Sequence, residues 1–465
     1  MISRGMRNTN VFKTISKAFR NGSVATKLSF FAPPVGHFLH RQYGKGVLYL
    51  LAQVAFTFFM VFGGARALVQ LFSGNLGVKV SGEVWNEELQ IFEKIRGDNS
   101  FLILLYGVAA ILVTAGYLCL CYQSVKACYE ADLRLREGKP LPTAKEDFLE
   151  VLDRRFHIPL LIPPMLGLLV FTVLPLIFMV LIAFTNYDYA HMPPGKLFDW
   201  VGLANFKALF SLSGGSSAFA LVFLRVLLWT LVWALLATFT NYFLGILLAL
   251  AIGRKGIRGK AFFRTVFVLS IAVPQFVSLL LMQKVLDGDG ILNKVLGTNF
   301  LWLADQRNFS ILPRVMILLV NIWVGVPYTL LMATGILGNI PADYFEAAKI
   351  DGASPVKAFV HVTLPYMLQV TTPYLITQFV TNVNNFNVIW LLTGGGPVDN
   401  VYYGGGTQAQ STDLLVTWLY RLTTDKNPRY NVAAVIGIII FVICAVASLI
   451  VYGRSSSVKS EGDFQ

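Results

Sequence analysis

Charged side chains are scarce in this sequence. They make up 14% of its 465 residues, whereas 55% of the residues are hydrophobic. A soluble domain carries about 25% charged residues, so the composition excludes a soluble globular protein and also a disordered one. Because only helices that satisfy their own backbone or closed barrels can span a bilayer, and long uncharged runs favour helices, we expect an all-α polytopic membrane protein.

Cysteine is also rare. Three of the four cysteines lie in apolar stretches, the fourth, Cys128, lies just past one, and CxxC spacing does not occur. We therefore expect neither a disulfide nor a metal site. The first 29 residues are polar and basic and contain no apolar core. No signal peptide is expected, so the membrane spans themselves would direct insertion.

Long uncharged runs, in contrast, are frequent. A helix crosses a bilayer with about 20 apolar residues. Eight runs are predicted to span, at 47–63, 101–122, 158–184, 218–252, 265–285, 311–337, 367–392 and 432–452. The fourth of these runs is too long for one crossing and contains Arg225, so its crossing part is expected at Trp229–Ile252, with the preceding turns at the interface.

The net charge of +13 is unevenly distributed between the loops. The loops on the side of the two termini hold 24 Lys and Arg in 135 residues, and the opposite loops hold 11 in 134. Cytoplasmic loops are enriched in Lys and Arg, so both termini are predicted to be cytoplasmic and the chain to be a multi-pass protein of the plasma (inner) membrane. This topological explanation of the charge leaves no need for a nucleic-acid partner.

The spans fall into two groups. Residues 1–157 comprise a basic N-terminus, two spans and a charged connector, and six more closely spaced spans follow at 158–452. We expect these six spans to form the core of the protein and residues 453–465 to form a cytoplasmic tail. The loop at 338–366, between two of the core spans, carries the most informative sequence motif.

This loop, between the sixth and seventh spans, is predicted to begin with a short helix. Pro341 suits a first turn, the Glu-Ala-Ala-Lys stretch has high helix propensity, and Gly352 supplies a stop. Residues such as Tyr344 would give the helix an apolar surface, and residues such as Lys349 would give it a polar one. Such a helix outside the membrane is expected to have a protein partner.

The loop resembles the Glu-Ala-Ala signature of membrane subunits of binding-protein-dependent ATP-binding-cassette importers. Glu346-Ala347-Ala348 is followed by Gly352, and Val362-Thr363-Leu364-Pro365 ends the motif with Val in place of Ile. The resemblance implies a coupling helix seated on an ATPase subunit. It assigns this contact to Glu346, Ala347, Ala348, Asp351 and Gly352. An ordinary amphipathic connector is the alternative.

No GxxxxGK[ST] sequence is present. Such a loop is needed to cradle the phosphates of a nucleotide, so the chain is predicted not to be an enzyme and to hold no cofactor of its own. The resemblance implies that ATP and Mg are bound by partner ATPase subunits.

The seventh span is apolar enough to insert, yet it is rich in amides. An unpaired amide in hydrocarbon costs several kcal/mol, so these side chains should face the protein interior or a water-filled cavity. Spacings of four, three and three place Thr377, Thr381, Asn384 and Asn387 near one face of a helix. Uncharged donors and acceptors suit a neutral polyhydroxylated ligand, whereas packing between helices through hydrogen bonds is the structural alternative.

These stretches are similar to the MalF-type membrane subunits of maltose and maltodextrin importers. The similarity includes Asn384-Asn385-Phe386-Asn387, Thr393–Pro397, the sixth-span stretch Asn321–Tyr328 and Thr412–Val416. Gly325 and Pro327 in the sixth span would permit a broken or closely approached helix. The resemblance places a sugar site at Asn321, Gly325, Tyr328, Asn384 and Asn387.

The resemblance also implies a complex. Its members would be a MalG-like second permease subunit, two copies of an ABC ATPase and an extracytoplasmic sugar-binding protein, in the lipid bilayer. Two features depart from the family: Val383 stands where an aromatic residue is usual, and the loop at 185–217 is short.

Two other functions remain as alternatives. A secondary sugar transporter not driven by ATP would need ionisable groups inside its spans, but all eight spans lack Asp and Glu. A membrane-embedded enzyme would need a nucleophile, a metal or an acid–base pair at one depth, and the sequence offers none. The ATP-driven importer therefore remains the main prediction.

Overall fold

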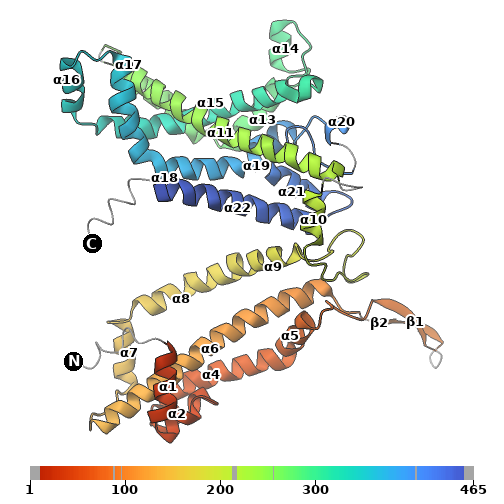
Figure 1. Ribbon diagram of the computed structural model, residues 1–465, viewed down its shortest axis with the longest axis vertical. Helices are drawn as coiled ribbons and strands as arrows, with labels where there is room; N and C mark the ends of the chain where they lie inside the picture. The colour runs from red at the N-terminus through yellow and green to blue at the C-terminus, as the bar shows by residue number, and fades with distance from the viewer. Residues whose placement is uncertain are drawn as a thin grey trace. The chain divides into compact units, whose positions relative to one another are not determined.

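The computed structural model describes residues 11–86, 90–95, 97–211, 217–254, 256–403 and 406–454. The chain forms two compact units, Met1–Gly202 and Leu203–Gln465. Nearly all regular structure in both is helical (Figure 1), which confirms the predicted all-α membrane fold.

The first unit is built on three long apolar helical segments, Tyr43–Phe72, Ser100–Arg136 and His157–Ile182. Its helices are α1 (Val11–Asn21), α2 (Val24–Leu28), α3 (Pro33–Leu39), α4 (Tyr43–Phe59), α5 (Ala65–Phe72), α6 (Ser100–Arg136), α7 (Ala144–Leu152), α8 (His157–Leu168) and α9 (Leu174–Ile182). Short π-helical segments, η2 (Met60–Gly64) and η3 (Leu169–Val173), join α4 to α5 and α8 to α9. An antiparallel hairpin of β1 (Gly82–Asn86) and β2 (Ile91–Ile95) pairs Gly82 with Ile95.

The second unit has more helices and deeper packing. Its helices are α10 (Ala204–Phe210), α11 (Ser217–Gly253), α12 (Lys260–Ala272), α13 (Gln275–Val285), α14 (Ile291–Leu296), α15 (Ile311–Gly338), α16 (Ala342–Ile350), α17 (Pro355–Ala358), α18 (Leu364–Val383), α19 (Phe386–Thr393), α20 (Asn400–Tyr403), α21 (Leu415–Thr424) and α22 (Tyr430–Arg454). A 3-10 turn, η5 (Arg307–Ser310), leads into α15, and a π-helical segment, η6 (Phe359–Thr363), leads into α18.

The predicted count of eight spans is not confirmed. Among the described residues, six helical segments are long and apolar enough to cross a membrane, and α12 with α13 would form a seventh that is bent by 92°. The predicted seventh span, 367–392, is divided between α18 and α19. The fourth run is one unbroken helix, α11, of 37 residues.

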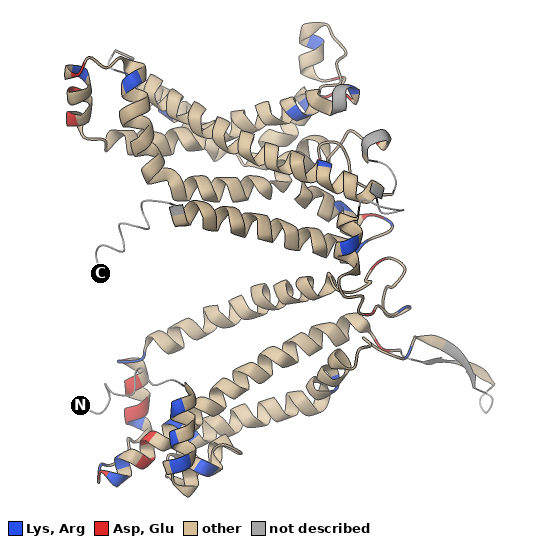
Figure 2. Ribbon diagram, viewed as in Figure 1, with Lys and Arg blue, Asp and Glu red and all other residues tan. Residues whose placement is uncertain are grey.

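Two apolar clusters form the centre of the second unit. One joins α11, α13, α15 and α19 through residues such as Trp233, Leu279, Ile317 and Val388. The other joins α11, α15 and α18 through Tyr242, Leu330 and Met367. Within each unit, charged side chains gather near the ends of the long helices, while the helices themselves are almost free of charge (Figure 2). The short charged helix α16 lies beyond the end of α15 (Figure 1).

Candidate functional site

The amide-rich stretch of the predicted seventh span is a break between two helices. α18 ends at Val383, and Asn384 is its C-terminal cap. Asn385 caps the start of α19, because its Oδ1 accepts the amide hydrogen of Val388 at 3.2 Å. The prediction that Thr377, Thr381, Asn384 and Asn387 share one helical face is therefore wrong, since asparagine side chains compete for backbone groups and end the helix here.

Asn382 attaches the break between α18 and α19 to α11. It is 5% exposed, and its Nδ2 donates to Thr238 Oγ1 on α11 at 2.9 Å. Its backbone carbonyl accepts the Trp233 indole N–H at 3.2 Å, and its Oδ1 accepts Asn385 Nδ2 at 3.3 Å. The packing alternative thus holds for Asn382. Trp233 and Thr238 were not singled out from the sequence, although an indole N–H in an apolar span always needs an acceptor.

The other two asparagines lie on the surface of this chain. Asn384 is exposed, and its Nδ2 donates to the carbonyl of Val380 at 3.0 Å and reaches Cys444 Sγ on α22 at 3.7 Å. Asn387 is exposed in the first turn of α19, whose opposite face is buried through Val388 and Ile389. Asn384 Oδ1 and both polar atoms of Asn387 are therefore open to a ligand or a neighbouring subunit.

The predicted sixth-span residues are divided between the inside and the outside of the unit. Asn321 is 5% exposed, whereas Tyr328 is 50% exposed. Gly325 faces α11, and a side chain there would collide with the amide of Asn241. α15 continues unbroken past Pro327, so of the two predicted possibilities the close approach is correct and the break is not.

Two buried side-chain amide atoms at the contact between α11 and α15 lack hydrogen-bond partners among the described residues. They are Asn321 Nδ2 on α15 and Asn241 Oδ1 on α11. Gly325 lies one turn after Asn321 and touches Asn241, so both amides belong to the same stretch of the α11–α15 contact. A buried polar atom without a partner is costly and calls for an explanation by a water molecule or a ligand. Asn241 was missed in the sequence because it stands alone in an apolar run.

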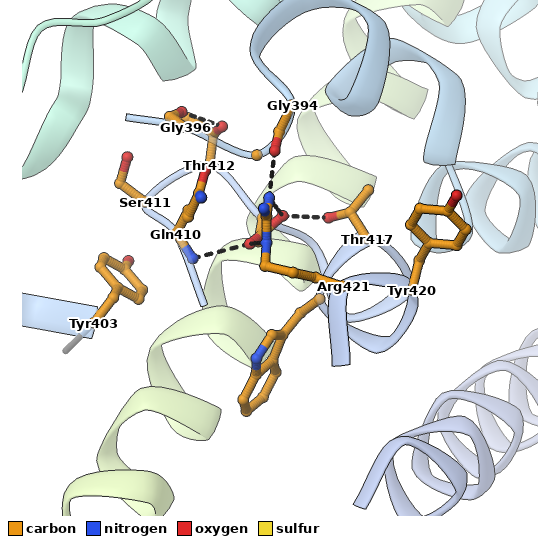
Figure 3. A network of polar contacts seen from close by, with 12 residues as sticks. Gly394, Gly396, Tyr403, Gln410, Ser411, Thr412, Thr417, Tyr420 and Arg421 are labelled. Carbon is orange, nitrogen blue, oxygen red and sulfur yellow. Dashed lines mark hydrogen bonds and ion pairs between the residues drawn. The ribbon is translucent and has the colours of Figure 1, made fainter. Parts of the chain in front are cut away.

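The loop after α19 is fixed by a buried ion pair (Figure 3). Asp413 has no exposed side-chain surface, and its Oδ2 lies 3.3 Å from Arg421 Nε. Asp413 Oδ1 accepts the Thr417 hydroxyl, Oδ2 accepts the backbone N–H of Gln410, both at 2.9 Å, and Arg421 also donates to the carbonyl of Gly394. Burial raises the pKa of the Asp413 carboxyl, and Arg421 acts in the opposite direction.

Further bonds attach the same loop to α11 and α15. Trp229 donates its indole N–H to the carbonyl of Thr412 at 3.2 Å, and Arg314 donates to the carbonyl of Ser411 at 2.7 Å. The Arg314 guanidinium also lies 4.7 Å from the centre of the Trp229 ring. Beside these residues is an open groove of about 480 Å³ between α11 and α15, which Arg225 and Tyr403 also line.

The short helix predicted at the start of the 338–366 loop is present as α16. It runs from Ala342 to Ile350 with Pro341 as its N-terminal cap, and no residue of it is buried in this chain. Gly352 has a φ of +70°, its N–H donates to the Lys349 carbonyl at 3.1 Å, and the N–H of Ala353 donates to the Ala348 carbonyl at 2.9 Å. This pair of bonds is a Schellman motif, which confirms Gly352 as the helix stop.

The predicted site residues Asn321, Tyr328, Asn384 and Asn387 offer amide and hydroxyl groups, which donate and accept hydrogen bonds without carrying charge. Among the residues that the structure describes, no group of three His, Cys, Asp or Glu side chains is placed to hold a metal ion.

Comparisons with known proteins agree with this architecture. A family model described as binding-protein-dependent transport system inner membrane component matches residues 242–457. The galactooligosaccharides transport system permease protein GanP of Bacillus subtilis is 35% identical over 446 residues, which cover 94% of this chain and 99% of GanP. The maltodextrin transport system permease protein MalC of Streptococcus pneumoniae is 33% identical, over 95% of this chain and 98% of MalC.

Two further matches cover less of the chain. The maltose/maltodextrin permease protein MalF of Escherichia coli K12 is 34% identical over 272 residues, or 57% of this chain and 51% of MalF. A chain of a bacterial ABC transporter involved in the import of the acidic polysaccharide alginate has a TM-score of 0.52 and 22% identity, covering 67% of this chain and 98% of that chain. The structural match supports the fold, and the sequence matches confirm the resemblance inferred from the motifs. The chain belongs to the family of binding-protein-dependent transport system inner membrane components, as a MalF-like permease subunit.

Proposed function

We propose that this permease subunit carries a neutral oligosaccharide of the maltodextrin type across the plasma (inner) membrane. The observation that carries the proposal is the break between α18 and α19, where the side chains of Asn384 and Asn387 are exposed within a predicted membrane span. Relatives named as maltodextrin and galactooligosaccharide permeases align with nearly the whole chain, which supports a sugar ligand.

The sugar would bind through amides and aromatic rings. Amides donate and accept hydrogen bonds without charge, which matches the hydroxyls of a neutral sugar. Tyr328 and Trp323 are each 50% exposed on α15 and offer aromatic faces. The unpartnered Asn321 Nδ2, next to Gly325, supplies a further donor once a rearrangement of α11 and α15 opens that contact.

The energy for transport would come from partner subunits. In this proposal α16 is the coupling helix, with Glu346, Ala347, Ala348, Asp351 and Gly352 against one of two ATPase copies, which bind ATP and Mg. The support is that a nine-residue helix with no buried residue, placed between α15 and α17, has the form of a docking element. A MalG-like second permease subunit and an extracytoplasmic sugar-binding protein complete the assembly.

The orientation follows from the loop charges. With 24 basic residues on the side of the termini against 11 on the other, both termini and α16 would be cytoplasmic, and the loop after α19 would face the binding protein. Labelling of a single cysteine at position 350 by a membrane-impermeant reagent in intact cells would contradict this orientation.

Sugar uptake by asparagine variants tests the ligand site. Asn384→Ala or Asn387→Ala removes one or two hydrogen bonds of about 0.5–1.5 kcal/mol each, so uptake at low sugar concentration should fall between about twofold and about 150-fold with assembly intact. Asn382→Ala should instead reduce the amount of assembled complex, because Asn382 bonds to α11. Asn339→Ala, at the exposed end of α15, is the matched control and should change neither quantity. Equal loss of assembly in all variants, with normal uptake per complex, would make the break purely structural.

A second experiment tests coupling. Glu346→Lys or Gly352→Pro should abolish uptake driven by ATP hydrolysis and weaken co-purification of the ATPase subunit, while membrane insertion persists. Val356→Ala, 71% exposed on α17 in the same loop, is the control and should have little effect. Normal co-purification and uptake in both test variants would rule out α16 as the coupling helix.

A further inference from the structure

The N-terminal helix α1 presents three different faces. Thr14 and Ala18 are buried against the rest of the first unit. Phe12 and Phe19 lie on a second face and are 80% and 61% exposed. The basic residues of α1 are exposed on a third face, about 100° farther round the helix: Lys13, Lys17 and Arg20.

The packing of α1 places it beside the end of a membrane span. Ala18 packs against Val125 and Tyr129 of α6. These two residues lie one to two turns beyond 101–122, the uncharged stretch of α6, so α1 lies at the level where the apolar part of the span ends. Arg136 Nη2, near the end of α6, donates to the carbonyl of Asn21 at 2.6 Å and secures the end of α1.

A buried carboxylate fixes this arrangement. Asp132 of α6 is 4% exposed, and its Oδ2 accepts the backbone N–H of Ser23 at 2.8 Å and the hydroxyl of Thr26. His40 Nε2 lies 3.1 Å from Oδ1 of the same carboxylate. The orientation of α1 and α2 on α6 is therefore set by bonds inside the unit, and their outer faces remain uncovered by it.

The apolar surface continues beyond α1 without any acidic charge. Val24 is 72% and Phe31 is 86% exposed, and the first 46 residues contain eight basic and no acidic side chains. Figure 2 shows Lys and Arg gathered on α1 and α2. Helix α7 of the same unit differs: its Phe148 is 63% exposed, but Glu146, Asp147 and Glu150 are its neighbours.

We propose that α1 lies in the headgroup layer of an anionic membrane leaflet. Phe12 and Phe19 enter the acyl-chain boundary, and Lys13, Lys17 and Arg20 lie at the lipid phosphates. A helix with an aromatic face and a basic face separated in this way is typical of helices in the interface plane, and juxtamembrane basic clusters favour anionic lipids. A protein partner is less well matched, because an acidic surface would satisfy the basic face but leave the phenyl rings in water.

Fluorescence quenching in nanodiscs tests this proposal with the full-length chain. A solvatochromic fluorescent amino acid is placed at position 12, 19, 17 or 148, in phosphatidylcholine alone or mixed with phosphatidylglycerol. Labels at 12 and 19 should be quenched several-fold more by brominated lipid than by iodide, and the label at 17 should show the reverse. Adding phosphatidylglycerol should deepen the label at 12 and leave the control at 148 unchanged.

A charge variant completes the test. The triple variant Lys13→Gln, Lys17→Gln, Arg20→Gln changes only exposed side chains and should abolish the effect of phosphatidylglycerol at position 12. Iodide quenching of positions 12 and 19 as strong as at 17, in both lipid mixtures, would overturn the proposal. Shielding that arises only after the partner subunits are added would also overturn it, and would identify α1 as a protein-docking surface.

Discussion

Each unit uses a buried carboxylate as an anchor, but the groups beside the two carboxylates differ. Asp413 in the second unit lies 3.3 Å from a guanidinium, Arg421, and arginine stays charged at any physiological pH. Asp132 in the first unit accepts hydrogen bonds from the Ser23 N–H and the Thr26 hydroxyl, and His40 Nε2 lies 3.1 Å from it. The loop after α19 is thus held by a permanent ion pair, while the N-terminal helices are held mainly by hydrogen bonds.

The largest effect is expected when the permanent pair is broken. Asp413→Ala leaves the Arg421 charge partly buried without its carboxylate, which should cost about 3–5 kcal/mol and lower the melting temperature of the purified protein in detergent. The double variant Asp413→Ala, Arg421→Met should recover much of this loss, and Asp425→Ala, at the exposed end of α21, should cause none. No recovery in the double variant would mean that the hydrogen bonds, rather than the charges, fix the loop.

A smaller effect is expected in the first unit. Asp132→Ala leaves the Ser23 N–H and the Thr26 hydroxyl without an acceptor but leaves no buried arginine charge behind. The loss should be about 1–3 kcal/mol, with faster trypsin cleavage in residues 11–28. Glu130→Ala on the exposed side of α6 is the control. A loss as large as that of Asp413→Ala would remove the distinction between the anchors.

A fall in pH should destabilise the packing of the N-terminal helices in the first unit. His37 on α3 is fully buried, and this burial lowers its pKa below the ordinary value of 6.5. Stability from the neutral His37 is complete above pH 6.5 and is lost as the pH falls from there through the lower folded value. The loss is at most about 1.4 kcal/mol per pH unit. Trypsin cleavage in residues 11–28 should therefore quicken from neutral to mildly acidic pH, and His37→Gln should flatten the profile, whereas slower cleavage in acid would contradict the assignment.

The smallest effect concerns the loop before α6. The backbone N–H groups of Val78 and Lys79 donate to Asp98 and lower its pKa below the ordinary 3.8. Their contribution is present above pH 3.8 and disappears as the pH falls through the lower folded value. Amide exchange at residues 78 and 79 should be slower in the wild type than in Asp98→Ala near neutral pH, with unchanged melting temperature. An unchanged exchange rate in the variant would show that Asp98 does not order this loop.

Sequence patterns predicted the long helices well and their interruptions poorly. Runs without charge gave the positions of α4, α6, α11, α15 and α22, because the need to satisfy backbone groups in lipid leaves few alternatives. They did not give the 92° bend between α12 and α13 or the end of α18 at Val383. Both depend on local hydrogen bonds and tertiary packing that hydropathy does not measure.

In the candidate site, too, local features could be predicted from the sequence and tertiary contacts could not. The Glu-Ala-Ala spacing predicted α16 and its stop at Gly352, since helix propensity and a left-handed glycine are local properties. Asn241 could not be predicted, because its contact with Gly325 joins residues far apart in the chain. The different roles of Asn382 and Asn384 also depend on which side of the broken helix faces Thr238.

The glycine contacts between α11 and α15 have a mechanical consequence. A side chain at Gly245 would collide with Thr329, and one at Gly325 would collide with Asn241, so the two helices are interlocked at matching positions one turn apart. The pair should therefore resist sliding, and the movement left to α15 is a tilt against α11. α15 has 28 residues and is about 42 Å long, so a tilt of about 5° about its far end would displace the start of α16 by roughly 4 Å. Motion applied at α16 is thus converted into leverage on the very contact that holds the two unpartnered amides.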